Sequence, residues 1–334
     1  MPSDRATVLG AWRYPPVATP TRMGKGAKSV GLFTSKGLVS MSLPQYAAAV
    51  EALRPDVAIA PADAPPPSSA RPSSKRLARA VQRSEDWLDQ LVDHFGGGPR
   101  LDELRISLFA PVLAVEQSMQ QSYLRRLAEE VTSSLSGLAV YEAGMVPGLM
   151  ACYPSLAPLP RLSLECASTP HEALRQVSLG VDLLAPTFVN RASESGVALS
   201  FAFAAPAGGR HGPPLPLGLD MLSAEHATSL EPLSDGCACQ ACACHHRAYL
   251  HHLLNAKEML GLSLLQIHNH HVACEFLADV RRALARGVAE FDEGRRRFSA
   301  AYQPELPEGA GESLRPRGRR FESEAGQAKG NTRS

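Results

Sequence analysis

Short apolar runs alternate with longer segments of helical spacing along most of this chain, and this alternation restricts the fold more than any other feature. The predicted strands cover residues 30–42, which hold one or two strands, and 56–60, 105–112, 137–141, 162–164, 182–185 and 197–202. The predicted helices cover 45–53, 75–95, 117–131, 170–179 and almost all of 245–291. Strands that alternate with helices indicate parallel pairing through right-handed crossovers.

About six strand–helix units follow one another, and none opens with a G-x-G-x-x-G turn. We therefore expect an α/β fold, a (β/α)8 barrel of the TIM type, with an open doubly wound sheet as the alternative. The barrel domain is expected over residues 30–303. Residues 1–29, rich in Pro, Gly and basic residues, and the polar tail 304–334 are expected to be poorly ordered and disordered, respectively.

The composition excludes few functions. The chain holds 34 Lys and Arg against 33 Asp and Glu, so any nucleic-acid surface must be a local patch. Residues 1–14 lack the apolar run of a signal peptide, and no stretch approaches the length of a transmembrane helix. We expect a cytoplasmic protein; a peripheral association with mitochondria is compatible with this pattern but not indicated by it.

Four of the seven cysteines fall within the twelve residues 235–246, DGCACQACACHH. Without a secretory signal, clustered thiols indicate metal ligands rather than disulfides. Cys237, Cys239 and Cys242 have the spacing of a thiolate fork, in which Cys-x2-Cys lets two sulfurs face one point. Cys244 is a spare thiol that we expect to be structural or exposed; the alternative is that it replaces Cys242 as a ligand.

A fourth ligand must come from elsewhere, and histidine is the commonest partner of three cysteines. The candidates are His245, His246, His251, His252, His268, His270 and His271. Any one of them alone is more often a surface or core residue. His268 ends an apolar run and can fold back on the fork after a helix of about seven turns. We therefore predict one structural Zn²⁺ per chain, bound by Cys237, Cys239, Cys242 and His268, since three thiolates leave no evident open position.

The segment 237–271 closely resembles the zinc-binding signature of tRNA-guanine transglycosylases, which exchange guanine for queuine or its bacterial precursor at the anticodon wobble position of tRNA. The fork is followed by Arg-Ala-Tyr-Leu-His-His-Leu at 247–253 and by the pair His268-Asn269. The resemblance extends over residues 43–300. It implies the same four zinc ligands and a (β/α)8 barrel with a zinc-bearing insertion at 237–271 and C-terminal helices.

Two departures from the catalytic members concern the reaction. Their nucleophile is the second aspartate of Met-Phe-Asp-Cys-Val, and its position here holds Ala185, in Gly-Val-Asp-Leu-Leu-Ala. A methyl group has no lone pair, so covalent catalysis at that place is impossible. Asp182 corresponds to a separate aspartate of the family. The second departure is Tyr141, where catalytic members have glycine in a loop that lines the base pocket; it either fills the space of the purine or points into the core.

Loss of nucleophile and pocket implies the non-catalytic subunit of a heterodimeric transglycosylase, without catalytic residues of its own, and residues 218–228 are similar to fungal members. The expected partners are the catalytic subunit and tRNA, although no tRNA-contacting residue is indicated. One alternative is an active glycosyl-transfer enzyme with its nucleophile relocated to Asp182 or Glu142. Another is a zinc-stabilised structural protein without an RNA role.

The heterodimer interface is expected at 249–265, where apolar residues exceed what one zinc site can bury. They are Leu250, Leu253, Leu254, Leu262, Leu264 and Leu265. The alternative is that they cover the barrel. The basic runs 295–297 and 315–320 can contact phosphate but are more often a solvated face or tail. Family members carry more sequence before Leu43-Pro44-Gln45-Tyr46 than the 42 residues here, so either the first βα units are abbreviated or the sequence is incomplete.

Overall fold

The computed structural model describes residues 6–11, 29–34, 37–64, 72–97, 99–204 and 213–307. Most of the segment 1–29 and of the tail 304–334, predicted to lack order, lies outside the described residues. The chain divides into two compact units. The first comprises the described residues up to Cys166 together with Leu179–Ala185, and the second comprises Ala167–Ser178 and the described residues from Pro186 onward.

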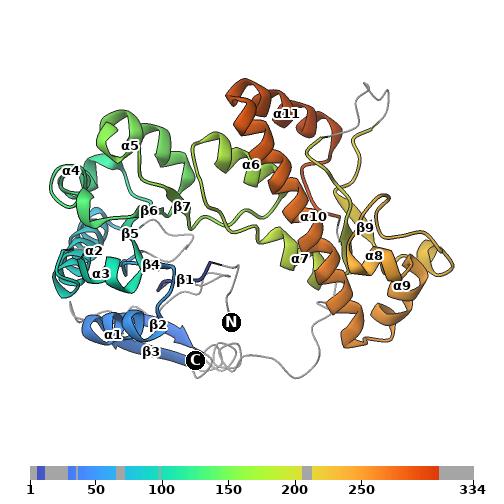
Figure 1. Ribbon diagram of the computed structural model, residues 1–334, viewed down its shortest axis with the longest axis horizontal. Helices are drawn as coiled ribbons and strands as arrows, with labels where there is room; N and C mark the ends of the chain where they lie inside the picture. Colours follow the sequence, from blue (N-terminus) through green and yellow to red (C-terminus); the bar gives the residue numbers. More distant parts are fainter. Residues whose placement is uncertain are drawn as a thin grey trace, which may run out of the picture. The chain divides into compact units, whose positions relative to one another are not determined.

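The first unit is built on a five-stranded parallel sheet in the order β1-β4-β5-β6-β7 (Figure 1). The strands are β1 (Val8–Leu9), β4 (Val57–Ile59), β5 (Ser107–Val112), β6 (Gly137–Val140) and β7 (Arg161–Ser163). The sequence predicted all of these except β1, which lies within the segment 1–29. The mixed α/β fold and the parallel pairing are therefore confirmed.

Helices connect the parallel strands, as the alternation predicted. They are α2 (Ser74–His94), α3 (Pro99–Leu104), α4 (Gln121–Glu129) and α5 (Val146–Cys152), with single 3-10 turns at Gln117–Gln120, Thr132–Ser134, Ala143–Met145 and Pro154–Leu156. Before β4 the chain forms an antiparallel hairpin of β2 (Ser29–Thr34) and β3 (Gly37–Ser42), which leads into α1 (Leu43–Leu53). Ser42 and Gln45 form a capping box there, which fixes the start of α1.

Both faces of this sheet are buried. Leu108, Ala110 and Val112 of β5 belong to the large apolar cluster that also includes Leu88 and Leu91 of α2. Phe109 points to the other face, into a smaller cluster with Ile59, Ala139 and Leu164. Strands buried on both sides read as continuous apolar runs, which is the pattern that the sequence shows. The ring of Phe109 lies over Gly137, where a Cβ atom would come within 2.4 Å of it.

The segment 182–185, predicted as a strand, makes only an isolated parallel bridge between Leu162 and Leu183. The carboxylate of Asp182 accepts hydrogen bonds from the backbone N–H of Arg161, at 2.9 Å, and from its Nε, at 2.7 Å. These bonds hold the segment at the edge of β7 without extending the ladder.

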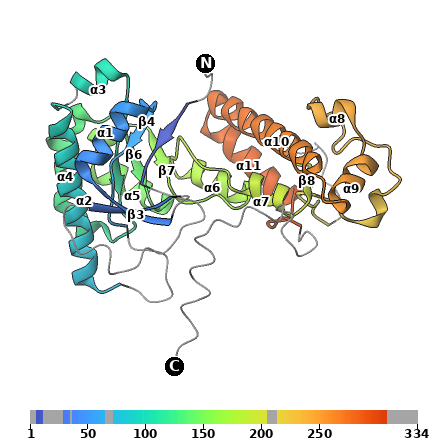
Figure 2. The same ribbon diagram turned by 90° about the horizontal axis from the view of Figure 1, so that it is seen from below.

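The second unit is mainly helical (Figures 1 and 2). Its helices are α6 (Pro170–Ser178), α7 (Phe188–Glu194), α8 (Gln240–Cys244), α9 (Arg247–Asn255), α10 (Met259–Arg286) and α11 (Val288–Ala301), with a 3-10 turn at Ala224–His226. The helical run predicted over 245–291 is broken twice. Lys257 adopts φ 58° between α9 and α10, and Gly287 adopts φ 124° between α10 and α11.

One strand prediction in this unit needs correction. β8 (Val197–Leu199) pairs with β9 (Gly218–Asp220), but the two strands are antiparallel. The close approach is possible because Gly218 has no side chain, since a Cβ atom there would lie 2.6 Å from the carbonyl oxygen of Ala198. The helices of the unit meet in an aromatic cluster. It contains Phe188, Phe201, Phe203, Phe276, Phe291 and Phe298.

None of the helices among the described residues is both long enough and apolar enough to cross a lipid bilayer.

Candidate metal centre

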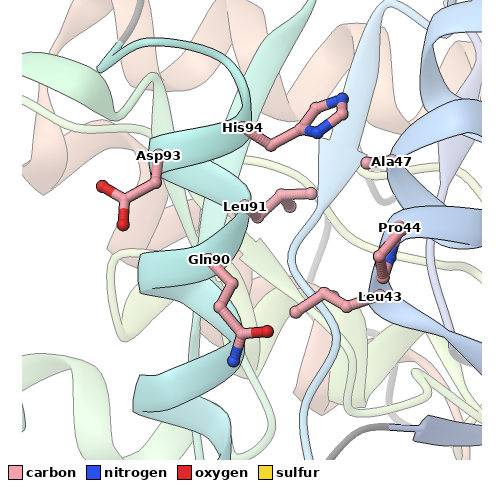
Figure 3. Close-up of a pocket in the computed structure, with 7 residues that line it drawn as sticks. All are labelled: Leu43, Pro44, Ala47, Gln90, Leu91, Asp93 and His94. Atoms are coloured by element: carbon pink, nitrogen blue, oxygen red, sulfur yellow. The ribbon is translucent and has the colours of Figure 1, made fainter.

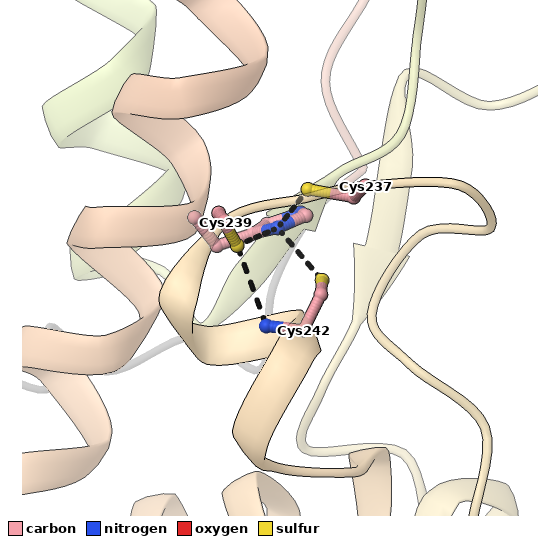
Figure 4. A group of neighbouring side chains, drawn as sticks. Cys237, Cys239 and Cys242 are labelled. Atoms are coloured by element: carbon pink, nitrogen blue, oxygen red, sulfur yellow. Dashed lines mark hydrogen bonds between the residues drawn. The ribbon is translucent and has the colours of Figure 1, made fainter.

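The three cysteines of the fork come from one short stretch of the second unit (Figure 4). Cys237 precedes α8, Cys239 is its N-cap, and Cys242 lies within the helix. The sulfur of Cys239 accepts a hydrogen bond from the backbone N–H of Cys242, at 3.4 Å. This cap turns the sulfurs of Cys239 and Cys242 toward the same point, which is why the Cys-x2-Cys spacing works as a pair of ligands.

His268 supplies the fourth side chain from α10. It is completely buried, and its Nδ1 lies 3.6 Å from the sulfur of Cys237, 3.5 Å from that of Cys239 and 3.4 Å from that of Cys242. All four donor atoms lie within 4.8 Å of one another. The structure thus brings together the four residues that the sequence predicted, in a group that can hold one metal ion.

The spacing of these atoms allows a test of fit. A tetrahedral zinc with Zn–S bonds of about 2.3 Å and a Zn–N bond of about 2.05 Å would separate each sulfur from the nitrogen by roughly 3.5 Å. The observed separations of 3.4–3.6 Å match this value. A single ring nitrogen cannot hydrogen-bond three thiols at once, so the arrangement fits metal ligation better than hydrogen bonding.

The other ring nitrogen of His268 is also fixed. Nε2 lies 2.8 Å from the carbonyl oxygen of Leu199, at the end of β8. Because a carbonyl can only accept, Nε2 carries the proton, and the lone pair of Nδ1 faces the sulfurs. Burial lowers the pKa of His268, which favours the neutral imidazole that binds metals.

The neighbouring Asn269 strengthens this attachment. Its Oδ1 accepts from the backbone N–H of Leu199, at 2.8 Å, and its Nδ2 donates to the carbonyl of Val197 and to Oγ of Ser193, both at 2.9 Å. The sequence noted Asn269 only as part of the signature. The structure shows why Asn269 matters: it is fully buried next to a ligand histidine, and a buried amide must find hydrogen-bond partners.

The thiols of the fork lie in an apolar surrounding. Burial raises the pKa of Cys237 to about 12 and also raises the pKa of Cys242. Without a positive charge nearby, these groups remain neutral thiols. A bound divalent ion would supply that charge and stabilise the thiolates.

The leucines expected at a partner interface are mostly core residues. They pack with Met221, Leu233 and Ala241 around the fork. Leu250, Leu253, Leu254, Leu264 and Leu265 are 0–7% exposed. A partner interface formed by Leu253 and Leu254 would require both side chains to be exposed, but both are buried in the apolar cluster around the fork. The N-terminal part of α10 exposes Met259, Leu260 and Ile267, at 70%, 48% and 41%, and its C-terminal end exposes Leu284, at 39%.

The remaining histidine candidates and the spare thiol lie outside the four-residue group. Nδ1 of His246 accepts from the N–H of Tyr249 and caps α9, while His245 stacks on the ring of Tyr249. His251 contacts the carbonyl of Met221 at 2.9 Å. Cys244 is exposed.

The two positions that depart from catalytic transglycosylases lie in the first unit. Ala185 is half-buried, and the nearby Asp182 is engaged by Arg161, as described above. Tyr141 directly follows β6 and shares the sheet face of Ala139, by strand alternation. It packs against both apolar clusters of the sheet, and burial raises its pKa. Glu142 is exposed.

Besides the four-residue group, the structure has a basic stretch on α11 and a groove between α1 and α2. Arg295, Arg296 and Arg297 on α11 form ion pairs with Asp292 and Glu293, and the basic run 315–320 lies outside the described residues. A groove of about 410 Å³ opens between α1 and α2 (Figure 3). It is lined by Leu43, Pro44, Ala47, Gln90, Leu91, Asp93 and His94. None of these residues was indicated by the sequence as functional.

Comparison with known proteins identifies similar chains. The sequence model of the family described as queuine tRNA-ribosyltransferase matches residues 15–304. A protein of Schizosaccharomyces pombe named queuine tRNA-ribosyltransferase accessory subunit 2 is 30% identical over 318 residues, which are 95% of this chain and 69% of that protein. Proteins of the same name from Drosophila virilis and Ixodes scapularis are each 30% identical, over 82% and 83% of this chain and 66% and 73% of their own lengths. The chain spans about two thirds of the length of these relatives.

Proposed function

The chain belongs to the queuine tRNA-ribosyltransferase family, and from this we propose that it is the non-catalytic subunit of a heterodimeric enzyme that exchanges guanine for queuine at the wobble position of tRNA. The observation that carries the proposal is Ala185. It stands where the catalytic members have their nucleophile, and the relatives in the comparison are named accessory subunits.

Neither alternative carboxylate has an environment that favours it as a relocated nucleophile. Asp182 accepts two hydrogen bonds from Arg161, which occupy its carboxylate and hold it at the edge of the sheet. Glu142 is exposed to solvent and forms no ion pair with a described residue that could activate it as a nucleophile. Tyr141 packs against two apolar clusters at the end of β6, at a position where catalytic members have the glycine that lines the base pocket.

The proposal includes a structural zinc ion bound by Cys237, Cys239, Cys242 and His268. Three thiolates and one imidazole complete a tetrahedron, so a bound ion would hold α8 against α10 and leave no position for substrate. The ion would contribute to folding rather than to chemistry.

We propose the (β/α)8 barrel as the complete architecture over residues 30–303, with 237–271 as the zinc-bearing insertion. What supports it is the family membership together with the parallel strands β4, β5, β6 and β7 and their intervening helices. The cytoplasm remains the proposed location, because the tRNA substrate of this family is available there.

The partner in this proposal is a catalytic subunit that docks on the zinc segment. Met259, Leu260 and Ile267 are exposed apolar residues in the N-terminal part of α10, and together they are here called the α10 surface. Leu260 and Ile267 are seven residues apart and therefore lie on one helix face. This surface replaces the buried leucines of α9 as the expected contact.

The experiment that tests the proposal mixes the purified chain with a catalytic subunit of the family and measures the mass in solution by light scattering. We expect one heterodimer whose mass is the sum of the two chains. A mixture in which both proteins keep their separate masses at micromolar concentration would contradict the accessory-subunit proposal.

A further inference from the structure

Helix α2 has a charge distribution that opposes its own dipole. Its first ten residues, 74–83, contain Lys75, Arg76, Arg79 and Arg83 and no acid. Its remaining residues contain Glu85, Asp86, Asp89 and Asp93. Cations at a helix N-terminus and anions at its C-terminus both interact unfavourably with the macrodipole. The stability of the helix therefore does not explain this arrangement.

The acidic half has a structural explanation. Nη1 of Arg126 on α4 forms ion pairs with Glu85, at 3.3 Å, and with Asp89. Arg126 therefore links α2 to α4, which pack side by side (Figure 2). Two of the four acids of α2 are thus accounted for by packing within the first unit.

In the basic half, Arg76 and Arg83 share the carboxylate of Asp63. Asp63 accepts from both terminal nitrogens of Arg76, at 2.7 and 2.8 Å, and from Nη1 of Arg83, at 2.8 Å. Lys75 and Arg79 are exposed and form no ion pair with another described residue. Lys75 and Arg79 therefore place two positive charges at this surface, in a chain whose formal net charge is only +1.

The position of this group, here called the α2 basic patch, is fixed by Asp63. Asp63 lies in the loop that leaves the carboxyl end of β4, so the N-terminal half of α2 lies at the carboxyl edge of the parallel sheet. In barrel folds this edge carries the loops that bind ligands. The arginines of α11 differ, because Arg295, Arg296 and Arg297 each have an acid within one helical turn.

We infer that the α2 basic patch binds the phosphate backbone of the tRNA, an inference that rests on the proposed function. The carboxylate of Asp63 holds Arg76 and Arg83 in place, and Lys75 and Arg79 project beside them on neighbouring helix positions. A fixed row of cations of this kind recognises phosphates without reading base sequence. A lipid surface would favour large exposed apolar side chains beside the cations, and the α2 basic patch has none.

The test is tRNA binding by the heterodimer as a function of salt. The variant is Lys75→Ala with Arg79→Ala, and the matched control is Arg296→Ala with Arg297→Ala, which removes the same charge from an exposed but acid-paired site. The probe is a tRNA transcript with guanine at the wobble position. Each phosphate contact contributes about 0.7–0.9 to the slope of log K against log salt, so the variant should lower the slope by roughly 1.5. Its affinity near physiological salt should fall about tenfold, and the control should bind like the wild type.

The outcomes separate this inference from the proposed function. If the wild-type pair forms and exchanges the base, but the α2 variant keeps its slope and affinity, the patch assignment is wrong and the proposed function stands. If the wild-type pair does not form or does not bind tRNA, both are wrong. Binding of the wild-type chain to phosphatidylserine vesicles that the α2 variant loses, with tRNA affinity unchanged, would assign the patch to a membrane surface and overturn the inference. An unchanged thermal midpoint confirms that each variant is folded.

Discussion

Nε2 of His268 donates a hydrogen bond to the carbonyl oxygen of Leu199 over 2.8 Å. The same residue, Leu199, donates its N–H to Asn269, so two adjacent side chains of α10 satisfy both backbone groups at the end of β8. The candidate metal site is therefore part of the packing between α10 and the β8–β9 pair. Loss of the metal should disturb this unit well beyond the fork itself.

We predict that Cys239→Ser combined with Cys242→Ser abolishes zinc binding and destabilises the second unit. Structural zinc sites contribute roughly 10 kcal/mol or more of apparent binding free energy, which becomes folding free energy. Elemental analysis should find one zinc per wild-type chain and none in the variant, and thermal unfolding should begin at a lower temperature. Cys244→Ser is the matched control and should keep one zinc. A double variant that retains full zinc would show that the ligands are wrong.

We predict that Asn269→Leu destabilises the protein although it leaves the four donor atoms intact. The change removes three hydrogen bonds and leaves the N–H of Leu199 and the carbonyl of Val197 buried without partners, at a cost of about 2–4 kcal/mol. Urea unfolding measures the loss, with the exposed Gln266→Ala on the same helix as control. Equal unfolding midpoints for the two variants would argue against the role assigned to Asn269.

His171 is expected to make stability depend on pH. Its ring packs on Phe298 of α11 with centroids 4.9 Å apart, and both ring nitrogens are buried without a hydrogen-bond partner among the described residues. Burial lowers its pKa below the ordinary 6.5. As pH falls through 6.5, His171 binds a proton in the unfolded chain but stays neutral in the folded chain. The free energy of unfolding therefore includes the contribution of His171 in full above pH 6.5 and loses it as pH falls below 6.5.

His171→Phe keeps the ring contact and removes the titration. The variant should therefore gain stability relative to the wild type, and the gain should be larger at pH 5.5 than at pH 7.5. Urea unfolding at both pH values measures it. If the difference in the free energy of unfolding between variant and wild type is the same at both pH values, His171 titrates normally in the folded protein.

The α10 surface leads to a prediction about pairing. Met259→Glu with Leu260→Glu should prevent the heterodimer from forming, since two charges would enter an apolar contact, and zinc content should stay at one per chain. Leu253→Glu should instead destabilise the zinc segment, because Leu253 is 7% exposed and packs around the fork. Co-purification with the catalytic subunit distinguishes the two effects. A stable heterodimer with both α10 substitutions present would move the interface elsewhere.

The sequence predicted the donor set of the metal site and most of the parallel sheet, because local patterns specify both. Cysteine spacing determines which sulfurs can meet, and the apolar run before His268 indicated a helix that reaches back to them. The orientation of the leucines of α9 was not predictable, since a leucine-rich helix looks the same whether it covers a metal site or a partner. The antiparallel pairing of β8 and β9 depends on the long-range approach at Gly218, and the roles of Asn269 and Asp182 depend on partners distant in sequence.

The most direct test of the central claim is base exchange measured on each chain alone and on the pair. Labelled guanine in a tRNA transcript is followed as queuine displaces it, and covalent protein–tRNA adducts are sought on denaturing gels. We predict no exchange and no adduct with the purified chain, including its Ala185→Asp variant, in which Tyr141 still occupies the end of β6. Exchange should occur only when the catalytic subunit is present. A covalent adduct between tRNA and this chain alone would contradict the account.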